Sequence, residues 1–385
     1  MTQSLAAPTQ RRHYTNPSAK LWVKASPNAD STLPTTPTPL AFHQAFPGYA
    51  PTPLVDVPTL ATRLGVRHVF VKDESMRLGL PAFKILGASW AVFLAICEKV
   101  DLNPRITTLE DLVKMEFDLE MTLVAATDGN HGRAVAHMAK VLNMKAKIFV
   151  PASVSRSSIA SIASEGATVT TINDSYDEAV RQAASHAACS PSTHLLIQDT
   201  SWTGYETIPA LIVSGYTTLF AEIDTQLASL KLPSPSLVVV PVGVGSLAHA
   251  ATLHYRSHPS ATPTSLLSVE PTNAPCLLTS LLNGSPQSIT TTDTIMPGLN
   301  CGTVSPLAWP DLFAGVDLAC SVTDRQAVEA LEELGKLGID VGPCGGATLA
   351  GLLEMRGEPQ ELGGDSVIVL INTEGSEVYR GDVQQ

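Results

Sequence analysis

Short apolar runs alternate with amphipathic segments in the middle of the chain. Three of these runs predict strands, and each is followed by a polar turn and a segment of helical periodicity. The predicted strands are residues 121–126, 145–150 and 167–172, and the predicted helices are residues 132–142, 155–164 and 176–188. Alternation of this kind implies right-handed βαβ crossovers and a parallel sheet.

A second series of elements follows, interrupted by an irregular stretch rich in Thr and Gly. Its predicted helices are residues 208–230, 246–255, 323–337 and 347–354, and its predicted strands are residues 236–241, 265–270 and 366–371. Ahead of both series, residues 68–72 predict a strand. Residues 84–100 predict a helix that is apolar nearly all round and therefore buried. We expect an α/β protein of two lobes, each a mainly parallel sheet flanked by helices.

The start of the chain has a different composition. Residues 25–58 are rich in Pro, Thr and Ser, which disfavours regular elements. We expect residues 1–50 to form an N-terminal arm extended over the surface. Residues 51–88 together with 200–385 are expected to form a large domain, and residues 89–199 a small domain.

The overall composition excludes several classes of protein. Of 385 residues, 44% are apolar and 16% are charged, which excludes a disordered chain. The 24 Lys and Arg stand against 36 Asp and Glu, a net charge of −12, so binding to nucleic acid or to an anionic membrane is not expected. No apolar run approaches the ~18 residues of a membrane span. The N-terminus lacks the apolar core of a secretory signal, and an organelle presequence is the less favoured alternative.

Six cysteines are scattered along the chain without a CxxC pair. This spacing argues against a zinc site and against a disulfide scaffold, and it favours a reducing compartment. We therefore expect a cytoplasmic enzyme with no metal ion.

A glycine-containing turn joins a predicted strand to a predicted helix at residues 242–246. Gly243 and Gly245 allow backbone N–H groups to approach an anion, and the helix N-terminus adds partial positive charge there. The turn lacks the complete GxGxxG pattern of a dinucleotide site. The same two glycines also suit a tight turn that binds nothing.

Lys84 stands in an apolar segment, residues 79–87, where a buried helix is predicted to begin. Burial disfavours the ammonium ion and lowers the pKa of a lysine. A neutral amine is what Schiff-base chemistry with a carbonyl cofactor requires. The alternative is a lysine whose stem packs while its charged head reaches water.

A polar turn at residues 127–132 links a strand to a helix. In parallel sheets, ligands bind at the carboxyl ends of strands, where such turns lie. Asp128 and Asn130 are equally consistent with helix N-caps, and His131 with a packing residue.

A second polar segment, residues 198–206, follows the last strand of the small domain. Its acid, Asp199, and its aromatic pair, Trp202 and Tyr205, suit a substrate pocket at the junction of the lobes.

Five short motifs stand in a fixed order along the chain. They are Lys72-Asp-Glu-Ser75, Ala82-Phe-Lys84, Thr127-Asp-Gly-Asn-His-Gly132, Gly243-Val-Gly-Ser-Leu247 and Thr373-Glu-Gly375. The same order is found in the tryptophan-synthase-β-like, fold type II enzymes that use pyridoxal 5′-phosphate. Within that superfamily the chain most resembles the diaminopropionate ammonia-lyase family, from about residue 50 onward. That resemblance adds Gln198-Asp-Thr200, Gly204-Tyr-Glu206, Ile295-Met296, Gly298-Leu299, Cys301-Gly302 and Tyr379-Arg380.

The resemblance implies that the cofactor binds in a cleft between the lobes, held mainly by the large domain. Lys84 would hold it covalently beside Phe83, and Asn130 would hydrogen-bond its 3′ oxygen. Thr373 would face the ring nitrogen. The phosphate would be bound by Gly243, Val244, Gly245, Ser246 and Leu247.

Two aspartates would lie around the reacting carbon. They are Asp128 and Asp199, and with Lys84 they form the implied catalytic set. Asp128 is the discriminating residue, because the motif of serine and threonine dehydratases has Ser in its place.

Three departures from the family leave the amino-acid substrate open. Gly342-Pro-Cys-Gly-Gly346 stands where the family tends to have Gly-Glu-Ser-Gly. The segment after Gly375 is shorter and lacks an acidic-threonine pair. Residues 155–161 lack the charged residues expected there.

The function that the resemblance implies is α,β-elimination of ammonia from D- and/or L-2,3-diaminopropionate, giving pyruvate and ammonia. The alternatives are a serine or threonine dehydratase, a β-replacement enzyme, and a catalytically silent binding protein. The expected partners are a small amino-acid substrate and a second copy in a homodimer, with neither nucleic acid nor membrane.

Overall fold

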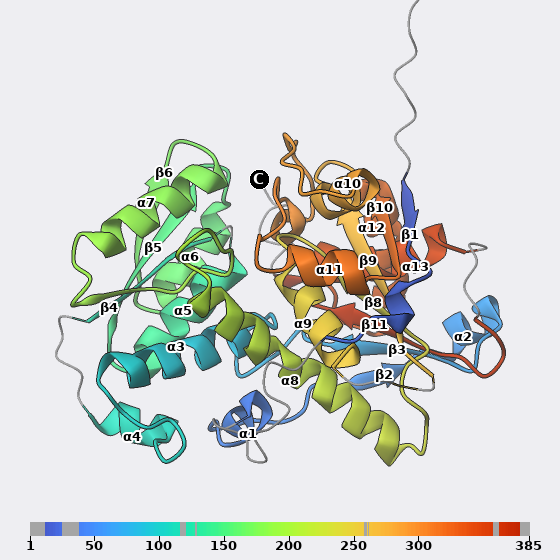
Figure 1. Cartoon of the computed structure of the whole chain (residues 1–385), viewed down its shortest axis with the longest axis horizontal. Helices are drawn as coiled ribbons and strands as arrows, with labels where there is room; N and C mark the ends of the chain where they lie inside the picture. The colour runs from blue at the N-terminus through green and yellow to red at the C-terminus, as the bar shows by residue number, and fades with distance from the viewer. Residues whose placement is uncertain are drawn as a thin grey trace, which may run out of the picture.

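Two sheets, each covered by helices, divide the described part of the chain into two lobes (Figure 1). This computed structural model describes residues 12–24, 38–115, 121–127, 129–257, 260, 262–356 and 362–377. The predicted α/β architecture of two mainly parallel sheets is confirmed. No helix among the described residues is long and apolar enough to cross a bilayer.

The larger lobe is built on a seven-stranded sheet of order β1-β10-β9-β8-β11-β3-β2. Its inner five strands are parallel, and β1 and β2 pair antiparallel at the two edges. Strands β8 and β11 are buried along their whole length and therefore appear in the sequence as continuous apolar runs. The strands are β1 His13–Thr15, β2 Leu54–Asp56, β3 His68–Asp73, β8 Leu237–Pro241, β9 Ser265–Pro271, β10 Leu318–Val322 and β11 Val367–Asn372.

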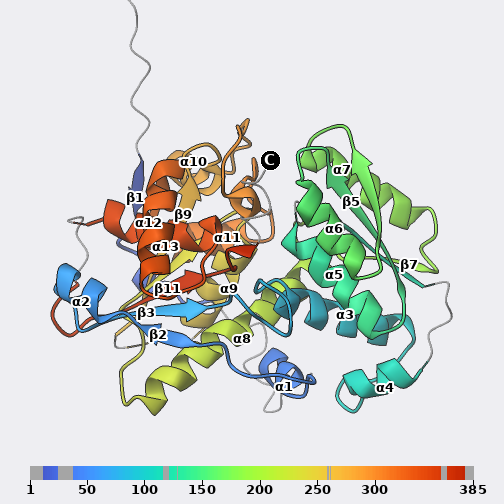
Figure 2. The same ribbon diagram turned by 180° about the vertical axis from the view of Figure 1, so that it is seen from behind.

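Helices cover both faces of this sheet (Figure 2). The side chains of α2, α12 and α13 pack on one face, and those of α8 to α11 on the other. The bounds are α2 Pro58–Leu64, α8 Thr207–Ser229, α9 Ser246–Tyr255, α10 Cys276–Asn283, α11 Trp309–Gly315, α12 Asp324–Lys336 and α13 Pro343–Glu354, with 3₁₀ turns η1 Ala19–Leu21 and η2 Pro297–Leu299.

The smaller lobe is built on a four-stranded parallel sheet of order β6-β5-β4-β7. Ser155 and Ser175 cap two of its helices, each accepting a hydrogen bond from the backbone N–H three residues later. The strands are β4 Thr122–Ala126, β5 Lys145–Pro151, β6 Thr168–Ile172 and β7 His194–Leu196. The helices are α3 Ile85–Lys99, α4 Leu109–Lys114, α5 Asn130–Val141, α6 Arg156–Ser164 and α7 Tyr176–Ala188.

Helices α3 and α8 pack against each other where the lobes meet, with α1 (Pro39–Gln44) beside them (Figure 1). The crossing is close at Gly215, because a Cβ there would lie 2.5 Å from the carbonyl oxygen of Leu86. One apolar core continues through this junction from the small lobe into the large one. The junction therefore fixes the start of α3, where Lys84 stands.

Several sequence predictions of local structure are wrong. The Pro-rich stretch predicted without regular elements contains α1 and β2, although residues 25–37 of it lie outside the described residues. The stretch between β9 and α12, predicted as irregular, contains α10, α11 and β10. Prolines at the first helical position begin α1 and α2, so there they promote helices instead of breaking them. The domain boundaries stay a prediction.

Candidate active site

A cavity of ≈ 860 Å³ lies at the carboxyl ends of the strands, with walls from both lobes. The turn after β4 and the end of β5 form one side, and the turns after β8 and β11 form the other. Every residue to which the resemblance assigns a role and that the structure describes lines this cavity, and Asp128 lies outside the described residues. The aromatic pair suggested for a substrate pocket does not line it: Trp202 and Tyr205 stack on each other instead. The residues brought together are Phe83, Lys84, Asn130, Asp199, Gly243, Val244, Gly245, Ser246, Leu247 and Thr373.

Lys84 and Asp199 form an ion pair in this cavity, with Nζ 2.6 Å from Oδ2. The lysine side chain is 20% exposed and the aspartate 6%. Burial alone would raise the pKa of Asp199, but the charge of Lys84 and the hydrogen bond from Lys84 outweigh it and lower the pKa to about 2. Asp199 is therefore a carboxylate at every pH at which an enzyme works.

Neighbouring side chains fix Asp199 in place. The Gln198 amide donates to Asp199 Oδ1 (3.4 Å) and to the Tyr176 hydroxyl (2.9 Å). Its oxygen accepts from the backbone N–H of Ala126, at the end of β4. Tyr205 donates to the Leu196 carbonyl and accepts from the backbone N–H of Gln198. The Gln-Asp motif thus ties the acid to the central strand of the small lobe.

His131 lies beneath this ion pair. Its Nε2 is 2.8 Å from the carbonyl of Ile197, so Nε2 carries the proton, and Nδ1 faces Asp199 at 3.9 Å. Burial is the main cause that lowers the pKa of His131. His131 is therefore a neutral imidazole whose Nε2 proton is already donated to a carbonyl. It packs beside Asp199.

The glycine turn forms an anion cradle at the large-lobe wall. Gly245 is the N-cap of α9 and has φ 96°, which a side chain would strain. A Cβ on Gly243 would lie 2.7 Å from the Gly298 carbonyl oxygen. The Ser246 hydroxyl donates to the carbonyl of Asp199 (3.0 Å) and so couples the cradle to the ion pair. Backbone N–H groups at a helix N-terminus suit a phosphate.

Two residues after β11 complete the wall. The Thr373 hydroxyl is buried and has no hydrogen-bond partner among the described residues. Glu374 accepts from the Asn130 amide (2.8 Å), which joins the large lobe to the small one across the cavity. It also accepts from the backbone N–H of Cys344 (3.3 Å), at the start of α13. Burial raises the pKa of Glu374, although the hydrogen bonds from Cys344 and Asn130 act in the opposite direction.

These features fit pyridoxal phosphate. The cradle offers N–H groups to a phosphate, the orphaned Thr373 hydroxyl can pair with a ring nitrogen, and Lys84 offers an amine to the aldehyde. Within the described residues no group of His, Cys, Asp and Glu has the arrangement of a metal site.

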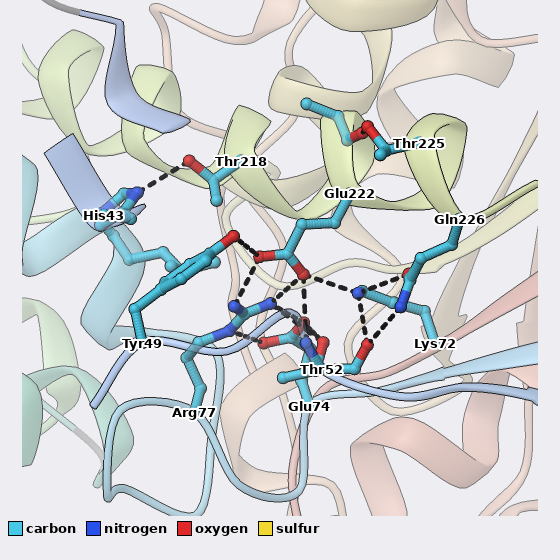
Figure 3. A network of polar contacts seen from close by, with 12 residues as sticks. His43, Tyr49, Thr52, Lys72, Glu74, Arg77, Thr218, Glu222, Thr225 and Gln226 are labelled. Carbon is cyan, nitrogen blue, oxygen red and sulfur yellow. Dashed lines mark hydrogen bonds and ion pairs between the residues drawn. The ribbon is translucent and has the colours of Figure 1, made fainter. Parts of the chain in front are cut away.

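Lys72, the other lysine near Lys84 in the sequence, lies in a separate buried network (Figure 3). Its Nζ is 2.6 Å from Glu222 and 2.8 Å from the carbonyl of Thr52. Arg77 donates to Glu222 and to Glu74 at distances of 2.6 to 2.8 Å. The two cations, Lys72 and Arg77, balance the charges of the two anions, Glu222 and Glu74. The network anchors the loop that leads from β3 to Lys84.

Part of the cavity wall is not predicted from the sequence. Glu374 belongs to the Thr373-Glu-Gly375 motif, and the signal for its role is a carboxylate placed directly after a buried parallel strand. Residues 291–294 also line the cavity, and only the adjoining Ile295-Met296 belongs to a motif of the resemblance. Cys301 and Cys344 also line the cavity; Cys344 belongs to the segment that departs from the family.

Comparison with known proteins identifies the family of the chain. The family model described as pyridoxal-phosphate dependent enzyme matches residues 45–374. Diaminopropionate ammonia-lyase of Salmonella typhimurium is 37% identical over 298 residues, 76% of this chain and 73% of the relative.

Two solved structures of Escherichia coli diaminopropionate ammonia lyase are similar in fold. One, in complex with an aminoacrylate-PLP azomethine reaction intermediate, has a TM-score of 0.79 and 32% identity, covering 89% of this chain and 91% of that one. Another, in complex with D-serine, has a TM-score of 0.84 and 30% identity, covering 96% and 98%. The predicted fold type and the predicted cofactor are confirmed. The chain belongs to the diaminopropionate ammonia-lyase family of pyridoxal-phosphate-dependent enzymes.

Proposed function

We propose that this enzyme eliminates ammonia from 2,3-diaminopropionate and releases pyruvate and a second ammonia. The observation that carries the proposal is the buried Lys84–Asp199 pair, 2.6 Å apart, beside a glycine cradle in a cavity between the lobes. Pyridoxal phosphate, when bound, supplies the electron sink that makes the α proton of an amino acid acidic. The side chains around it then decide which bond breaks.

Asp199 is the residue that favours a β-amine over a β-hydroxyl. The carboxylate is nearly buried, so it requires a cation close by. With pyridoxal phosphate bound, Lys84 would be the residue that holds it, and the β-ammonium of diaminopropionate would then supply the cation beside Asp199. Serine offers only a neutral hydroxyl at that position and leaves the carboxylate without a cation.

Lys84 would serve as one base once the substrate has freed its amine. Its uncharged amine takes the α proton, the electron pair of the Cα–H bond forms the Cα–Cβ double bond, and the Cβ–N bond breaks toward nitrogen. Because the β-amine enters as an ammonium, it leaves as neutral ammonia. The released enamine takes up water and yields pyruvate and a second ammonia, so atoms and charge balance.

Asp128 is proposed as the base on the face of the cofactor ring opposite Lys84. It follows Thr127 directly, and Asn130 two positions later lines the cavity. Bases on opposite faces would each take the α proton from one enantiomer, so both D- and L-diaminopropionate would react. One structure of the Escherichia coli relative holds D-serine, which supports a family site that admits a D-amino acid.

We further propose that the enzyme is a cytoplasmic homodimer.

The test is a panel of amino acids. The holoenzyme is incubated with D- and L-diaminopropionate, serine and threonine, and keto acid and ammonia are measured. The proposal expects turnover of at least one diaminopropionate isomer well above that of serine or threonine. Turnover of serine or threonine alone would replace it with a dehydratase. Cofactor binding with no turnover of any amino acid would favour a silent binding protein.

A further inference from the structure

Where α3 and α8 cross closely, one α8 side chain, Tyr216, packs beside the backbone segment that carries Lys84. A Cβ on Gly87 would lie 2.5 Å from Cε1 of the Tyr216 ring, so glycine at 87 is what lets the ring occupy this space. The Tyr216 ring also packs on Phe83, with centroids 4.8 Å apart. Phe83 and Lys84 both line the cavity. The Tyr216 ring therefore packs against the segment that carries Lys84.

The Tyr216 hydroxyl is unusual in this setting. The residue is fully buried, and its hydroxyl makes no hydrogen bond of ordinary geometry to any described residue. It nevertheless interacts with the Lys84 side chain and with the charge of Asp199. A buried donor without a partner is destabilising, so a tyrosine here in place of phenylalanine calls for an explanation.

We propose that Tyr216 is a positioning residue for Lys84, whose hydroxyl donates a hydrogen bond to the amine when that amine is uncharged. Asp199 accepts hydrogen bonds only, so it stabilises the ammonium form. The Tyr216 hydroxyl has a proton with no other acceptor among the described residues, so it stabilises the neutral form. The lysine is thereby held between two partners that favour opposite protonation states.

The protonation of Tyr216 itself supports this assignment. Burial is the main cause that raises the pKa of Tyr216. The hydroxyl therefore keeps its proton and stays a donor throughout the working range of the enzyme. A neutral amine is the form that can attack the cofactor aldehyde and the form that can take a proton from a substrate.

The inference rests on the proposed role of Lys84 as the cofactor-linked base, and its test is independent of the substrate. The full-length protein is freed of cofactor and treated with trace amounts of an acylating reagent that modifies only neutral amines. Modification of the Lys84 peptide is followed by mass spectrometry between pH 6 and 11. The midpoint of that curve reports the pKa of Lys84.

Replacing Tyr216 with Phe removes only the hydroxyl. We expect the midpoint to rise by about half to one pH unit, which makes modification of Lys84 about three- to tenfold slower below both midpoints. Asp199→Asn should move the midpoint down. The melting temperature of Tyr216→Phe should equal or exceed that of the wild type, because an orphaned group is removed.

Tyr255→Phe is the matched control, since the Tyr255 hydroxyl on α9 is also buried without a hydrogen-bond partner among the described residues, and Tyr255 does not line the cavity. It should leave the Lys84 midpoint unchanged. A midpoint that is unchanged or lower in Tyr216→Phe would overturn the inference. If the wild-type enzyme did not turn over diaminopropionate but the Lys84 midpoint still rose in Tyr216→Phe, the proposed function would be wrong and the role of Tyr216 would stand.

Discussion

Lys84 and Asp199 are separated by 115 positions in the sequence, yet their charged atoms lie 2.6 Å apart in the cavity. The pair joins the start of α3, at the lobe junction, to the small-lobe residue that follows β7. Asp199 holds the lysine charged, whereas bond formation with an aldehyde needs the lysine neutral. The catalytic cycle we propose resolves this opposition, because the substrate brings a second cation to Asp199.

Lys84→Ala should abolish covalent attachment of the cofactor and lower turnover by about 10⁴-fold or more, the scale for removal of a central catalytic group. In the wild type, borohydride reduction followed by peptide mapping should find the pyridoxyl group on the peptide of Lys84. A label on Lys72 would contradict the assignment. Lys72 is poorly placed to react with the cofactor, because its amine is fully buried and paired with Glu222.

Asp199→Asn should lower turnover of diaminopropionate by about 10²–10⁴-fold. The loss should be greater for diaminopropionate than for serine, because only the former places an ammonium beside residue 199. Steady-state kinetics with both substrates measure this difference. An equal loss on both would show that Asp199 does not discriminate between leaving groups.

Gly243→Ala should weaken cofactor binding. Its Cβ would lie 2.7 Å from the Gly298 carbonyl oxygen, so the cradle must shift. Overpacking of this kind costs about 1–3 kcal/mol, or about five- to 150-fold in the cofactor dissociation constant. Titration of the cofactor-free protein gives that constant.

Gly284→Ala is the control for Gly243→Ala. Gly284 ends α10 with φ 68°, and no other group lies within 4 Å of a Cβ there. It should affect stability alone. Equal cofactor affinity in wild type and Gly243→Ala would show that the turn is only structural.

Stability should fall in acid partly through Glu222. Burial would raise the pKa of this group, but hydrogen bonds and charges from Arg77 and Lys72 lower it to about 2. A pKa lower in the folded state than in the unfolded state gives stability that is complete above the ordinary glutamate pKa of about 4.3. That stability is lost as the pH falls through the interval down to about 2.

Glu222→Gln should remove this pH dependence. At neutral pH it should also cost about 3–5 kcal/mol of unfolding free energy, because Arg77 and Lys72 lose a buried partner. Glu329→Gln, at an exposed pair on α12, should change stability by less than about 0.5 kcal/mol. Chemical denaturation at pH 7, 5 and 3 measures both. If the unfolding free energies of wild type and Glu222→Gln changed with pH in the same way, the proposed contribution of Glu222 to acid sensitivity would be contradicted.

Asp128→Asn should reduce turnover of D-diaminopropionate more than that of the L-isomer, while the melting temperature and the cofactor absorbance stay near wild type. Asparagine caps a helix as well as aspartate does but cannot accept a proton. Chiral assays of the remaining substrate separate the isomers. Wild-type rates with both isomers would exclude Asp128 as a base.

The sequence predicts the regular core of this protein well and its periphery poorly. Strands such as β8 and helices such as α8 carry unbroken apolar patterns, because parallel strands and junction helices are buried on all sides. Strand β1 has three residues and pairs with β10, more than three hundred positions away, so no local pattern could reveal it. Short helices such as α10 and α11 are fixed by packing in the folded lobe.

The candidate site shows the same division. Lys84, Asn130 and the glycine cradle follow strands or begin helices, so motif position alone predicts that they meet. The partners of these residues depend on tertiary packing. The hydrogen bond between Asn130 and Glu374 spans the two lobes, and Tyr216 packs against Phe83 and Gly87 only because α3 and α8 cross.

The central claim is elimination of an amine, and the ratio of ammonia to pyruvate tests it most directly. The holoenzyme is given diaminopropionate as the only amino acid, and both products are quantified over the same time course. Elimination of the β-amine followed by hydrolysis predicts two ammonia for each pyruvate. One ammonia for each pyruvate, or no pyruvate from diaminopropionate while serine yields it, would contradict the account.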